Sequence, residues 1–362
     1  MALRVIQWAP GHVGQSALHG ILDHPDLELV GVRVYSPGKD GKDAGELCGR
    51  PPTGVVATRD ADALLAMDAD CVVYCGSEAD YDSLVNEWCA ILSSGKNLVS
   101  SAMLPMVFPP ALPEWLQEKG ARIEAACQQG GTSVYVSGIN PGLLLDIVPA
   151  ILASGCRDLE SISVVEHYDD VRTSGFGPDI MKELFGFGVT PEEDAPHADA
   201  RILVCQEYWA STLRLLAHDL GGELGPITTT RETVLATEFI DAPGVPIEPG
   251  TIAGLHVHLE GAVGGTRLAY HEYVCMGRNV PRPGWPKEPE GGGYRILIEG
   301  RPNLQVEMTL IGDGKDPLDE AFVYTAYRIV NAVPAVCAAP PGMQHFSSIA
   351  REVSGHARPA PG

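Results

Sequence analysis

The sequence predicts an α/β protein, with a doubly wound parallel sheet in its N-terminal part followed by an α+β domain with a mostly antiparallel sheet. Short apolar strands alternate with helical segments through the first part, which predicts parallel strands joined by helices. After about residue 155, longer strands of alternating polarity follow one another directly, which predicts antiparallel pairing. At 362 residues the chain is long enough for two domains.

The first part alternates strand and helix in chain order. The predicted segments are Leu3–Trp8, Gly14–Leu22, Leu27–Tyr35, Ala61–Met67, Cys71–Cys75, Tyr81–Ser93, Asn97–Ser101, Leu112–Gly120 and Ser133–Ser137. Ligands of such sheets bind outside the carboxyl ends of the strands. Candidate ligand contacts therefore follow Trp8, Tyr35, Cys75, Ser101 and Ser137.

The second part consists mainly of strands. They are predicted at Ser161–Asp170, Thr228–Ile240, Thr251–Leu259, Arg267–Met276, Tyr294–Glu299 and Asn303–Leu310. The glycines of Gly261–Thr266 predict a hairpin loop. Helices near Ile202–Leu220 and Asp319–Ala332 are expected to pack on one face of this sheet. Pro281–Gly293 is expected to be a loop, and Gly355–Gly362 a mobile tail.

Composition excludes several classes of function. Hydrophobic residues make up 45% and charged residues 20%, as in globular proteins, and the net charge of −22 disfavours binding to nucleic acids or anionic membranes. The chain enters a strand at once, without a signal-peptide apolar region, so we expect a cytoplasmic protein. Its nine cysteines form no C-x-x-C pair, which indicates reduced, mostly buried thiols and no cysteine zinc site.

A glycine turn follows the first strand. Its sequence, Ala9-Pro10-Gly11-His12-Val13-Gly14, departs from G-x-G-x-x-G only at Ala9. Such a turn brings backbone close to a pyrophosphate, and the next helix directs its free N–H groups toward it. The pattern predicts NAD or NADP binding; the alternative is a structural turn in another kind of α/β domain.

The end of the second strand bears on the choice between NAD and NADP. NAD-selective sites usually carry an acidic residue there that binds the ribose 2′-hydroxyl, and neither Tyr35 nor Ser36 is acidic. Ser36, Lys39 and Lys42 could instead surround a 2′-phosphate, so we predict NADP, with NAD possible. The alternative is a solvated loop whose lysines balance nearby aspartates.

Three further strand ends supply candidate cofactor contacts. Cys75 and Gly76 begin a loop of small residues, and Ser101 ends the next strand. Asn140 and Pro141 are expected to cap and begin a helix whose N-terminus donates hydrogen bonds to a carboxamide or substrate. The alternative is an ordinary capped helix.

These segments resemble a known family. The resemblance rests on Arg4–Gly14, Tyr35–Gly45, Gly138–Gly142 and Asn331–Gly342, which are similar to bacterial proteins with a dihydrodipicolinate-reductase-like N-terminal domain, including 2,4-diaminopentanoate dehydrogenase and native amine dehydrogenases. It implies a homodimer, an active site between two domains, and hydride transfer between nicotinamide C4 and a C=O or C=N carbon. We assign residues 1–142 to a dinucleotide-binding domain, 143–330 to a substrate and dimerisation domain, and 331–362 to a segment returning to the first.

The sequence departs from the family at one position. The resemblance implies a glutamate shortly after the strand Asn97–Ser101 that activates ammonia, but Ala102–Phe108 contains no ionisable residue. A methionine cannot accept a proton, so the acid–base group must lie elsewhere or the reaction must differ. The apolar segment, with Met103, is predicted to contact an apolar substrate.

Replacement acid–base candidates lie on the strand Ser161–Asp170. Alternation places Glu166 and Tyr168 on one face and His167 and Asp169 on the other. Tyr168, His167 or Glu166 is predicted to exchange the proton, the alternative being a packed or solvated strand residue. The aromatic residues Phe176, Trp209 and Trp285 either line a substrate pocket, as we predict for Phe176, or pack in the core.

A histidine pattern remains. His256, His258 and Glu260 share a strand face, which could hold a metal, but dimer contacts explain it as well, and we predict no metal. The sequence thus predicts an NAD(P)-dependent oxidoreductase acting on a small, rather apolar carbonyl, imine or amine. The alternatives are an amine dehydrogenase with a non-standard base and a nucleotide-binding sensor without turnover.

Overall fold

The computed structural model describes residues 2–77, 80–168, 178–183, 185–242, 244–277, 279–285, 293–312 and 317–349. The chain divides into two compact units. Unit 1 comprises Met1–Gly142 and Phe322–Gly362, and unit 2 comprises Leu143–Ala321. Phe176 and the tail Gly355–Gly362 lie outside the described residues.

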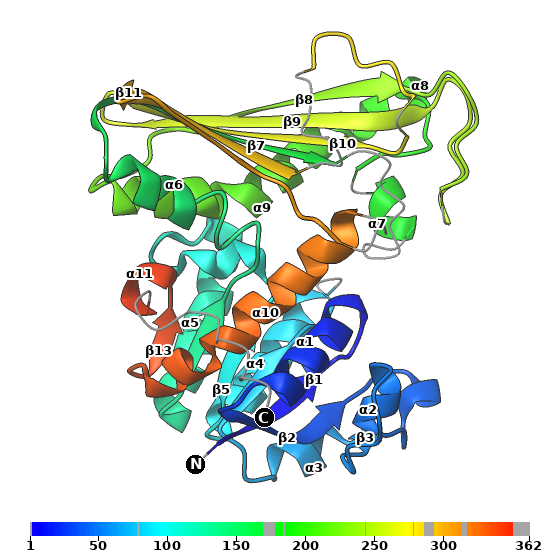
Figure 1. Cartoon of the computed structure of the whole chain (residues 1–362), viewed down its shortest axis with the longest axis vertical. Helices are drawn as coiled ribbons and strands as arrows, with labels where there is room; N and C mark the ends of the chain where they lie inside the picture. Colours follow the sequence, from blue (N-terminus) through cyan, green and yellow to red (C-terminus); the bar gives the residue numbers. More distant parts are fainter. Residues whose placement is uncertain are drawn as a thin grey trace, which may run out of the picture. The chain divides into compact units, whose positions relative to one another are not determined.

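Unit 1 contains a seven-stranded sheet in the order β13-β6-β5-β4-β1-β2-β3, and all of its strand pairs are parallel. The strands are β1 Leu3–Trp8, β2 Leu27–Arg33, β3 Ala57–Thr58, β4 Cys71–Tyr74, β5 Asn97–Ser100, β6 Ser133–Val136 and β13 Gly342–Gln344. The helices are α1 His12–Asp23, α2 Ala44–Leu47, α3 Ala61–Leu65, α4 Tyr81–Ser93, α5 Glu114–Gly130, α11 Phe346–Ile349 and, from Phe322 onward, α10 Pro317–Ala338 (Figure 1). The predicted doubly wound parallel sheet is confirmed.

Helix α10 packs in the core of unit 1. Its residues Ile329, Val330 and Val333 are fully buried in one cluster with Val5 and Leu18. Within the described residues α10 is also the helix that is long and apolar enough to cross a membrane, but a buried core helix meets the same criterion. The prediction that this helix packs beside Ile202–Leu220 on the second sheet is therefore wrong, because its apolar face is covered by α1 and the parallel strands.

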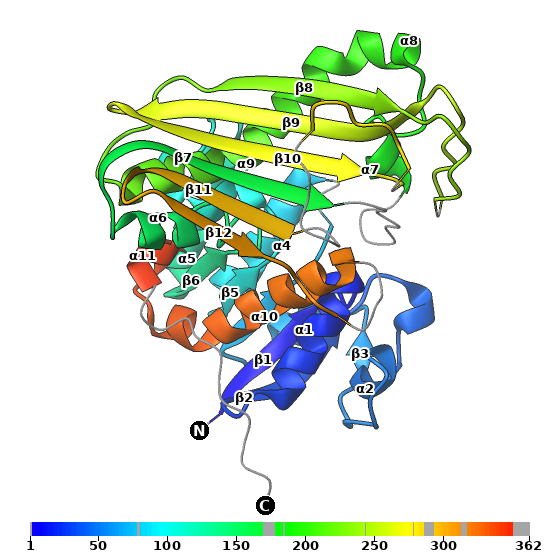
Figure 2. The same ribbon diagram turned by 45° about the horizontal axis from the view of Figure 1, so that its top comes forward.

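Unit 2 contains a six-stranded sheet in the order β12-β11-β7-β10-β9-β8, in which β7 and β10 pair in parallel and the other pairs are antiparallel (Figure 2). The strands are β7 Arg157–Tyr168, β8 Thr228–Leu235, β9 Ile252–Val263, β10 Thr266–Cys275, β11 Gly293–Arg301 and β12 Leu304–Met308. The helices are α6 Ile147–Ala153, α7 Pro178–Glu183, α8 Pro191–Asp194 and α9 Ala198–Asp219. Helices α6 and α9 lie on the same face of the sheet (Figure 1).

The connection between β9 and β10 is a tight hairpin. Val263 pairs with Thr266, so Gly264 and Gly265 form the loop, and Gly264 has φ of +57°. This left-handed conformation favours glycine. The predicted hairpin is confirmed.

The helix predicted to start at Pro141 begins six residues later. Helix α6 starts at Ile147, and its N-cap is Asp146, whose side chain accepts a hydrogen bond from the Ile147 amide. Asn140 is therefore not a helix cap. Gly142 has φ of +110°, which a helix excludes, so the chain forms turns until Asp146. The prediction of a capped helix at Asn140 and Pro141 is wrong.

Candidate functional site

In the turn between β1 and α1, the backbone of Ala9 packs closely against Gly14. Ala9 has φ of +63°, and a Cβ placed on Gly14 would lie 2.2 Å from the Ala9 carbonyl oxygen. Around Gly11 such a Cβ would meet nothing within 4 Å. Only glycine therefore fits at position 14, whereas Gly11 leaves space beside the backbone, as the close approach of a pyrophosphate requires.

Helix α1 presents an uncompensated N-terminus at this turn. Its N-cap is Gly11, which supplies no side-chain cap, and its first turn contains no acidic residue. The first-turn amides and the helix dipole can therefore bind an anion. Pro10 is buried, Val13 is partly buried, and the His12 ring stands edge-on to Phe322 with centroids 4.8 Å apart.

The neighbouring strand ends meet at the same edge of the sheet. The Cys75 amide donates to the Trp8 carbonyl at 2.9 Å, and the Ser101 amide donates to the Tyr74 carbonyl at 3.2 Å. Burial raises the pKa of Cys75 to about 11, although hydrogen bonds with Gln7 and Ser101 oppose the shift, so the thiol is neutral. Gly76 follows on this edge, and a Cβ there would lie 2.6 Å from the Tyr74 ring.

Asn140 and Pro141 lie in the loop after β6 in unit 1. The preceding Ile139 amide donates to the Thr325 hydroxyl of α10 at 3.2 Å, which ties the loop to that helix. Pro141 is buried and Asn140 is partly buried. The structure thus places both residues beyond the carboxyl end of a parallel strand, without the helix N-terminus predicted for them.

The lysines predicted near a 2′-phosphate differ in their contacts. The Lys39 ammonium donates to the Pro10 carbonyl at 2.7 Å, so it lies beside the glycine turn. The Lys42 ammonium instead forms an ion pair with Glu46 at 2.6 Å. Ser36 is exposed and precedes the short 3₁₀ helix Pro37–Lys39. Of the two cations, only Lys39 contacts the turn.

The apolar segment after β5 is buried. Met103 has φ of +63° and no exposed surface, and it precedes the 3₁₀ helix Leu104–Val107. Ala102 and Phe108 are also buried. The segment therefore provides an apolar wall without an ionisable group.

A buried glutamate lies on β7 in unit 2. Glu166 accepts hydrogen bonds from the hydroxyls of Tyr270 and Tyr294, each at 2.6 Å. Tyr168 bonds to Tyr294 at 3.0 Å, which extends the network. Burial raises the pKa of Glu166 to about 7 against the effect of the two tyrosines. A carboxyl that titrates near neutral pH is suited to acid–base catalysis.

A second acidic residue, for which the sequence predicted no acid–base role, lies beside Glu166. Glu272 on β10 is the register partner of Glu166 and is 9% exposed. Its Oε2 has no hydrogen-bond partner among the described residues. Burial, and then the charge of Glu166, raises the pKa of Glu272 well above its usual range. The sequence places His271 and Glu272 on opposite faces, but only the β7–β10 register shows which one faces Glu166.

His167 lies on the opposite face of the sheet from Glu166 and Tyr168, as alternation predicts, while Asp169 lies outside the described residues. Its ring stacks on Tyr273 with centroids 5.5 Å apart, and its Nε2 lies 3.4 Å from the Arg282 guanidinium. The structure therefore brings together Glu166 and Tyr168 but not His167.

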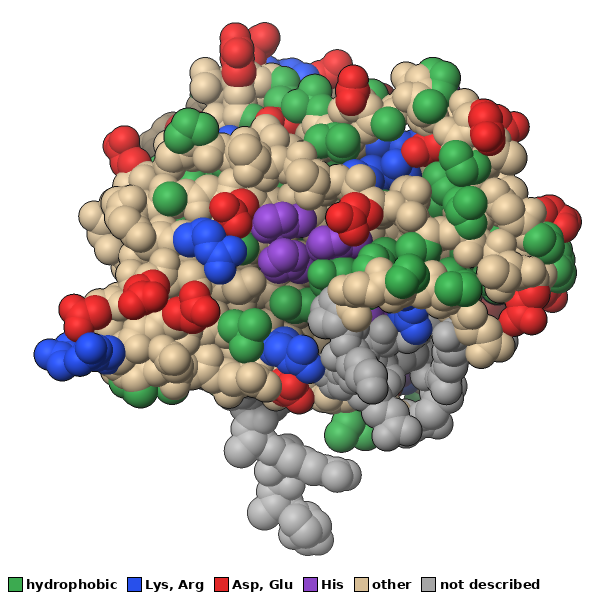
Figure 3. Space-filling model, turned by 90° about the horizontal axis from the view of Figure 1, so that it is seen from above, with side chains coloured by type: hydrophobic (Ala, Val, Ile, Leu, Met, Phe, Trp, Pro, Cys, Tyr) green, Lys and Arg blue, Asp and Glu red, His purple; other side chains and the backbone are tan. Residues whose placement is uncertain are grey.

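The strand register places His256, His258 and His271 on the same face of the sheet as His167. Histidine side chains gather on the surface seen in Figure 3. His258 and His271 stack at 4.2 Å, and His256 stacks on Tyr273 at 4.1 Å. Burial, followed by the neighbouring imidazoles, lowers the pKa of His271 to about 3, so the ring is neutral at physiological pH. Within the described residues no group of three or more metal-ligating side chains is arranged to hold an ion.

Two tryptophans differ in their environments. Trp209 of α9 is buried against Tyr270, with ring centroids 5.8 Å apart, so it belongs to the core of unit 2. Trp285 lies on the histidine face, 5.1 Å from the Tyr273 ring.

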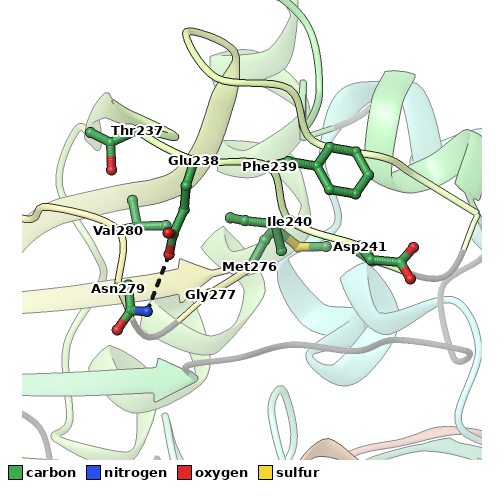
Figure 4. Close-up of a pocket in the computed structure, with 10 residues that line it drawn as sticks. Thr237, Glu238, Phe239, Ile240, Asp241, Met276, Gly277, Asn279 and Val280 are labelled. Atoms are coloured by element: carbon green, nitrogen blue, oxygen red, sulfur yellow. Dashed lines mark hydrogen bonds between the residues drawn. The ribbon is translucent and has the colours of Figure 1, made fainter.

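A separate hollow of about 450 Å³ opens in unit 2 (Figure 4). The segment Thr237–Ala242, Met276, Gly277, Asn279 and Val280 line it. Glu238 accepts a hydrogen bond from Asn279 across the hollow at 3.1 Å. None of the predicted site residues that the structure describes lines it.

Comparison with known proteins identifies the family. The family model of the 2,4-diaminopentanoate dehydrogenase C-terminal domain matches residues 143–356. The chain belongs to this family. It is 28% identical to an amine dehydrogenase from Streptomyces virginiae over 350 residues, covering 94% of each chain. It is 24% identical to 2,4-diaminopentanoate dehydrogenase from Acetoanaerobium sticklandii over 358 residues, covering 94% of this chain and 91% of the other.

A solved structure agrees with this assignment at the level of the fold. The amine dehydrogenase from Mycobacterium smegmatis superposes with a TM-score of 0.77 and 22% identity, covering 96% of each chain. The resemblance inferred from the sequence motifs is therefore confirmed. As a member of the 2,4-diaminopentanoate dehydrogenase family, this chain is an NAD(P)-dependent oxidoreductase.

Proposed function

We propose that the protein reduces a small, rather apolar carbonyl or imine, or oxidises the corresponding amine, with NADP as the preferred cofactor. The observation that carries this proposal is the turn at Ala9–Gly14, which fits only glycine at position 14 and leaves open space at Gly11 beside an uncompensated helix N-terminus. These features suit a pyrophosphate. When bound, the nicotinamide supplies or accepts a hydride at C4.

We assign cofactor binding to unit 1. The turn residues Ala9–Gly14 would hold the pyrophosphate, and Cys75, Gly76, Ser101, Asn140 and Pro141 would border the nicotinamide half, because all follow carboxyl ends of parallel strands. Substrate binding and dimer formation are assigned to unit 2. The names of the two relatives favour amines as the substrate class.

Glu166 is the acid–base residue that the chemistry favours. Ala102–Phe108 has no ionisable side chain, whereas Glu166 titrates near neutral pH and is bonded by two tyrosine hydroxyls. In the direction of reduction, protonated Glu166 would give a proton to the developing alkoxide or amine. Tyr168 would contribute through Tyr294, and Met103 would contact the apolar part of the substrate.

Lys39 should determine the preference for NADP. Lys39→Ala is expected to weaken NADPH binding about tenfold to a hundredfold more than NADH binding, because a hydrogen bond between charged groups is lost. Lys42→Ala is the matched control, since Lys42 already pairs with Glu46. Titration of both variants with both cofactors, followed by nicotinamide fluorescence, tests this. Equal losses of affinity for NADPH and for NADH in Lys39→Ala would show that Lys39 does not determine the preference for NADP.

The dependence of turnover on ammonium distinguishes reductive amination from simple carbonyl reduction. We would measure NADPH oxidation with a panel of apolar ketones and aldehydes, each with and without excess ammonium. Turnover that depends on ammonium identifies an amine dehydrogenase. Turnover that ignores ammonium identifies a carbonyl reductase, and no turnover with any member of the panel contradicts the proposed substrate class.

A further inference from the structure

Tyr35 is an exposed aromatic side chain held in one position. Its side chain is 45% exposed, yet its hydroxyl donates to Glu87 at 2.6 Å and accepts from the Trp8 indole N–H at 3.1 Å. The Tyr74 hydroxyl donates to the same Glu87 oxygen at 2.8 Å. An exposed ring is normally free to change rotamer, whereas these bonds fix it before any ligand arrives.

The ring is also supported from one side. The Arg33 guanidinium lies 4.7 Å from the centroid of the Tyr35 ring and 5.8 Å from that of Trp8, and it donates to the Val34 carbonyl. Its Nε is buried and has no hydrogen-bond partner among the described residues. Stacking therefore holds the guanidinium against the ring, and the exposed surface of Tyr35 remains open.

Tyr35 lies where doubly wound sheets bind the adenosine half of a dinucleotide. It follows β2 by two residues, and its partners Trp8 and Tyr74 end β1 and β4, so three adjacent strand ends build the group. In doubly wound sheets the ribose that carries adenine is contacted from the end of the second strand. The adenine ring beside that ribose is a flat aromatic group that stacks on exposed aromatic side chains.

We propose that the ring of Tyr35, fixed by Glu87 and Trp8 and backed by Arg33, is the stacking surface for the adenine ring of the cofactor. This inference rests on the proposed nicotinamide-dependent function and assigns a cofactor contact to Tyr35, whose residue type alone predicts none. Because NAD and NADP share adenine, Tyr35 should affect both cofactors equally. Lys39, by contrast, should separate them.

The test divides the cofactor into its two halves. Binding of ADP-ribose and of nicotinamide mononucleotide is measured by calorimetry for the wild type, Tyr35→Ala, Tyr35→Leu and Tyr35→Phe. Tyr35→Ala and Tyr35→Leu should weaken ADP-ribose, NADH and NADPH roughly tenfold to a hundredfold, the loss expected for one stacked base. Nicotinamide mononucleotide should bind all four proteins equally, and Tyr35→Phe, which keeps the ring, should retain most of the ADP-ribose affinity.

Two outcomes overturn the inference. Unchanged ADP-ribose affinity in Tyr35→Ala and Tyr35→Leu shows that adenine does not stack on this ring, and equal losses for ADP-ribose and nicotinamide mononucleotide show that Tyr35 only supports the fold of unit 1. Failure of the proposed function looks different, because the wild-type protein itself would then bind neither NADH nor NADPH.

Discussion

Gly14→Val is expected to abolish NAD(P)H binding. Since a Cβ at this position would lie 2.2 Å from the Ala9 carbonyl oxygen, the turn must move away from its place against α1. Loss of several hydrogen bonds to a charged pyrophosphate, each contributing about 1.5–3 kcal/mol, corresponds to an affinity loss of more than roughly a hundredfold. Calorimetric titration with NADH and NADPH measures the loss.

Two glycine variants control for folding. Gly265→Val alters a hairpin glycine of unit 2 whose Cβ would meet nothing within 4 Å, so it should leave binding unchanged. Gly11→Ala likewise meets no protein atom within 4 Å, so the protein should fold while the methyl group obstructs the pyrophosphate. Wild-type affinity for NADH and NADPH in both Gly14→Val and Gly11→Ala would show that this turn is not the cofactor site.

Glu166→Gln is expected to lower kcat for reduction by about a hundredfold or more, the usual contribution of a general acid. The wild-type rate should fall as pH rises through about 7, because Glu166 then loses the proton that it must give. The variant should lack this decline. Glu160→Gln, which alters an exposed carboxyl on the same strand, is the matched control and should behave as the wild type.

The free energy of unfolding, measured against pH, would show whether the glutamine variant is folded. The pKa of Glu166 is raised from 4.5 to about 7 by burial, so its stabilising contribution is complete below pH 4.5 and is lost as pH rises through about 7. Glutamine never ionises, so the variant should gain stability relative to the wild type above neutral pH. A wild-type pH profile with full activity in Glu166→Gln would show that the acid–base group lies elsewhere.

Most of the fold was predictable because short-range patterns determine it. The strand Leu3–Trp8 and the helix Tyr81–Ser93 agree with the prediction to the residue, since apolar runs and an Asp80 cap mark their limits. The placement of α10 was not predictable in this way. Its apolar face is visible in the sequence, but which of the two sheets it covers depends on the tertiary packing.

The candidate site was less accessible to prediction. The spacing of its glycines predicts the turn at Ala9–Gly14. The pairing of Glu166 with Glu272, by contrast, depends on the register of two strands about a hundred residues apart in the chain. The ties of Lys39 to Pro10 and of Tyr35 to Glu87 are likewise long-range contacts between side chains and elements distant in sequence. The prediction of a helix after Asn140 is wrong because Gly142 adopts a positive φ. The presence of a glycine in the sequence does not show which φ it adopts.

Transfer of a labelled hydride from NADPH to a substrate would establish that the protein catalyses hydride transfer. NADPH carrying deuterium at one face of C4, and then at the other, is supplied with a substrate that supports turnover or with the apolar carbonyl panel and ammonium, and the product is examined by mass spectrometry. We expect deuterium to appear on the former C=O or C=N carbon from one of the two labelled cofactors and not from the other. Tight binding of NADPH with no label in any product would contradict it and identify a nucleotide-binding protein without hydride transfer.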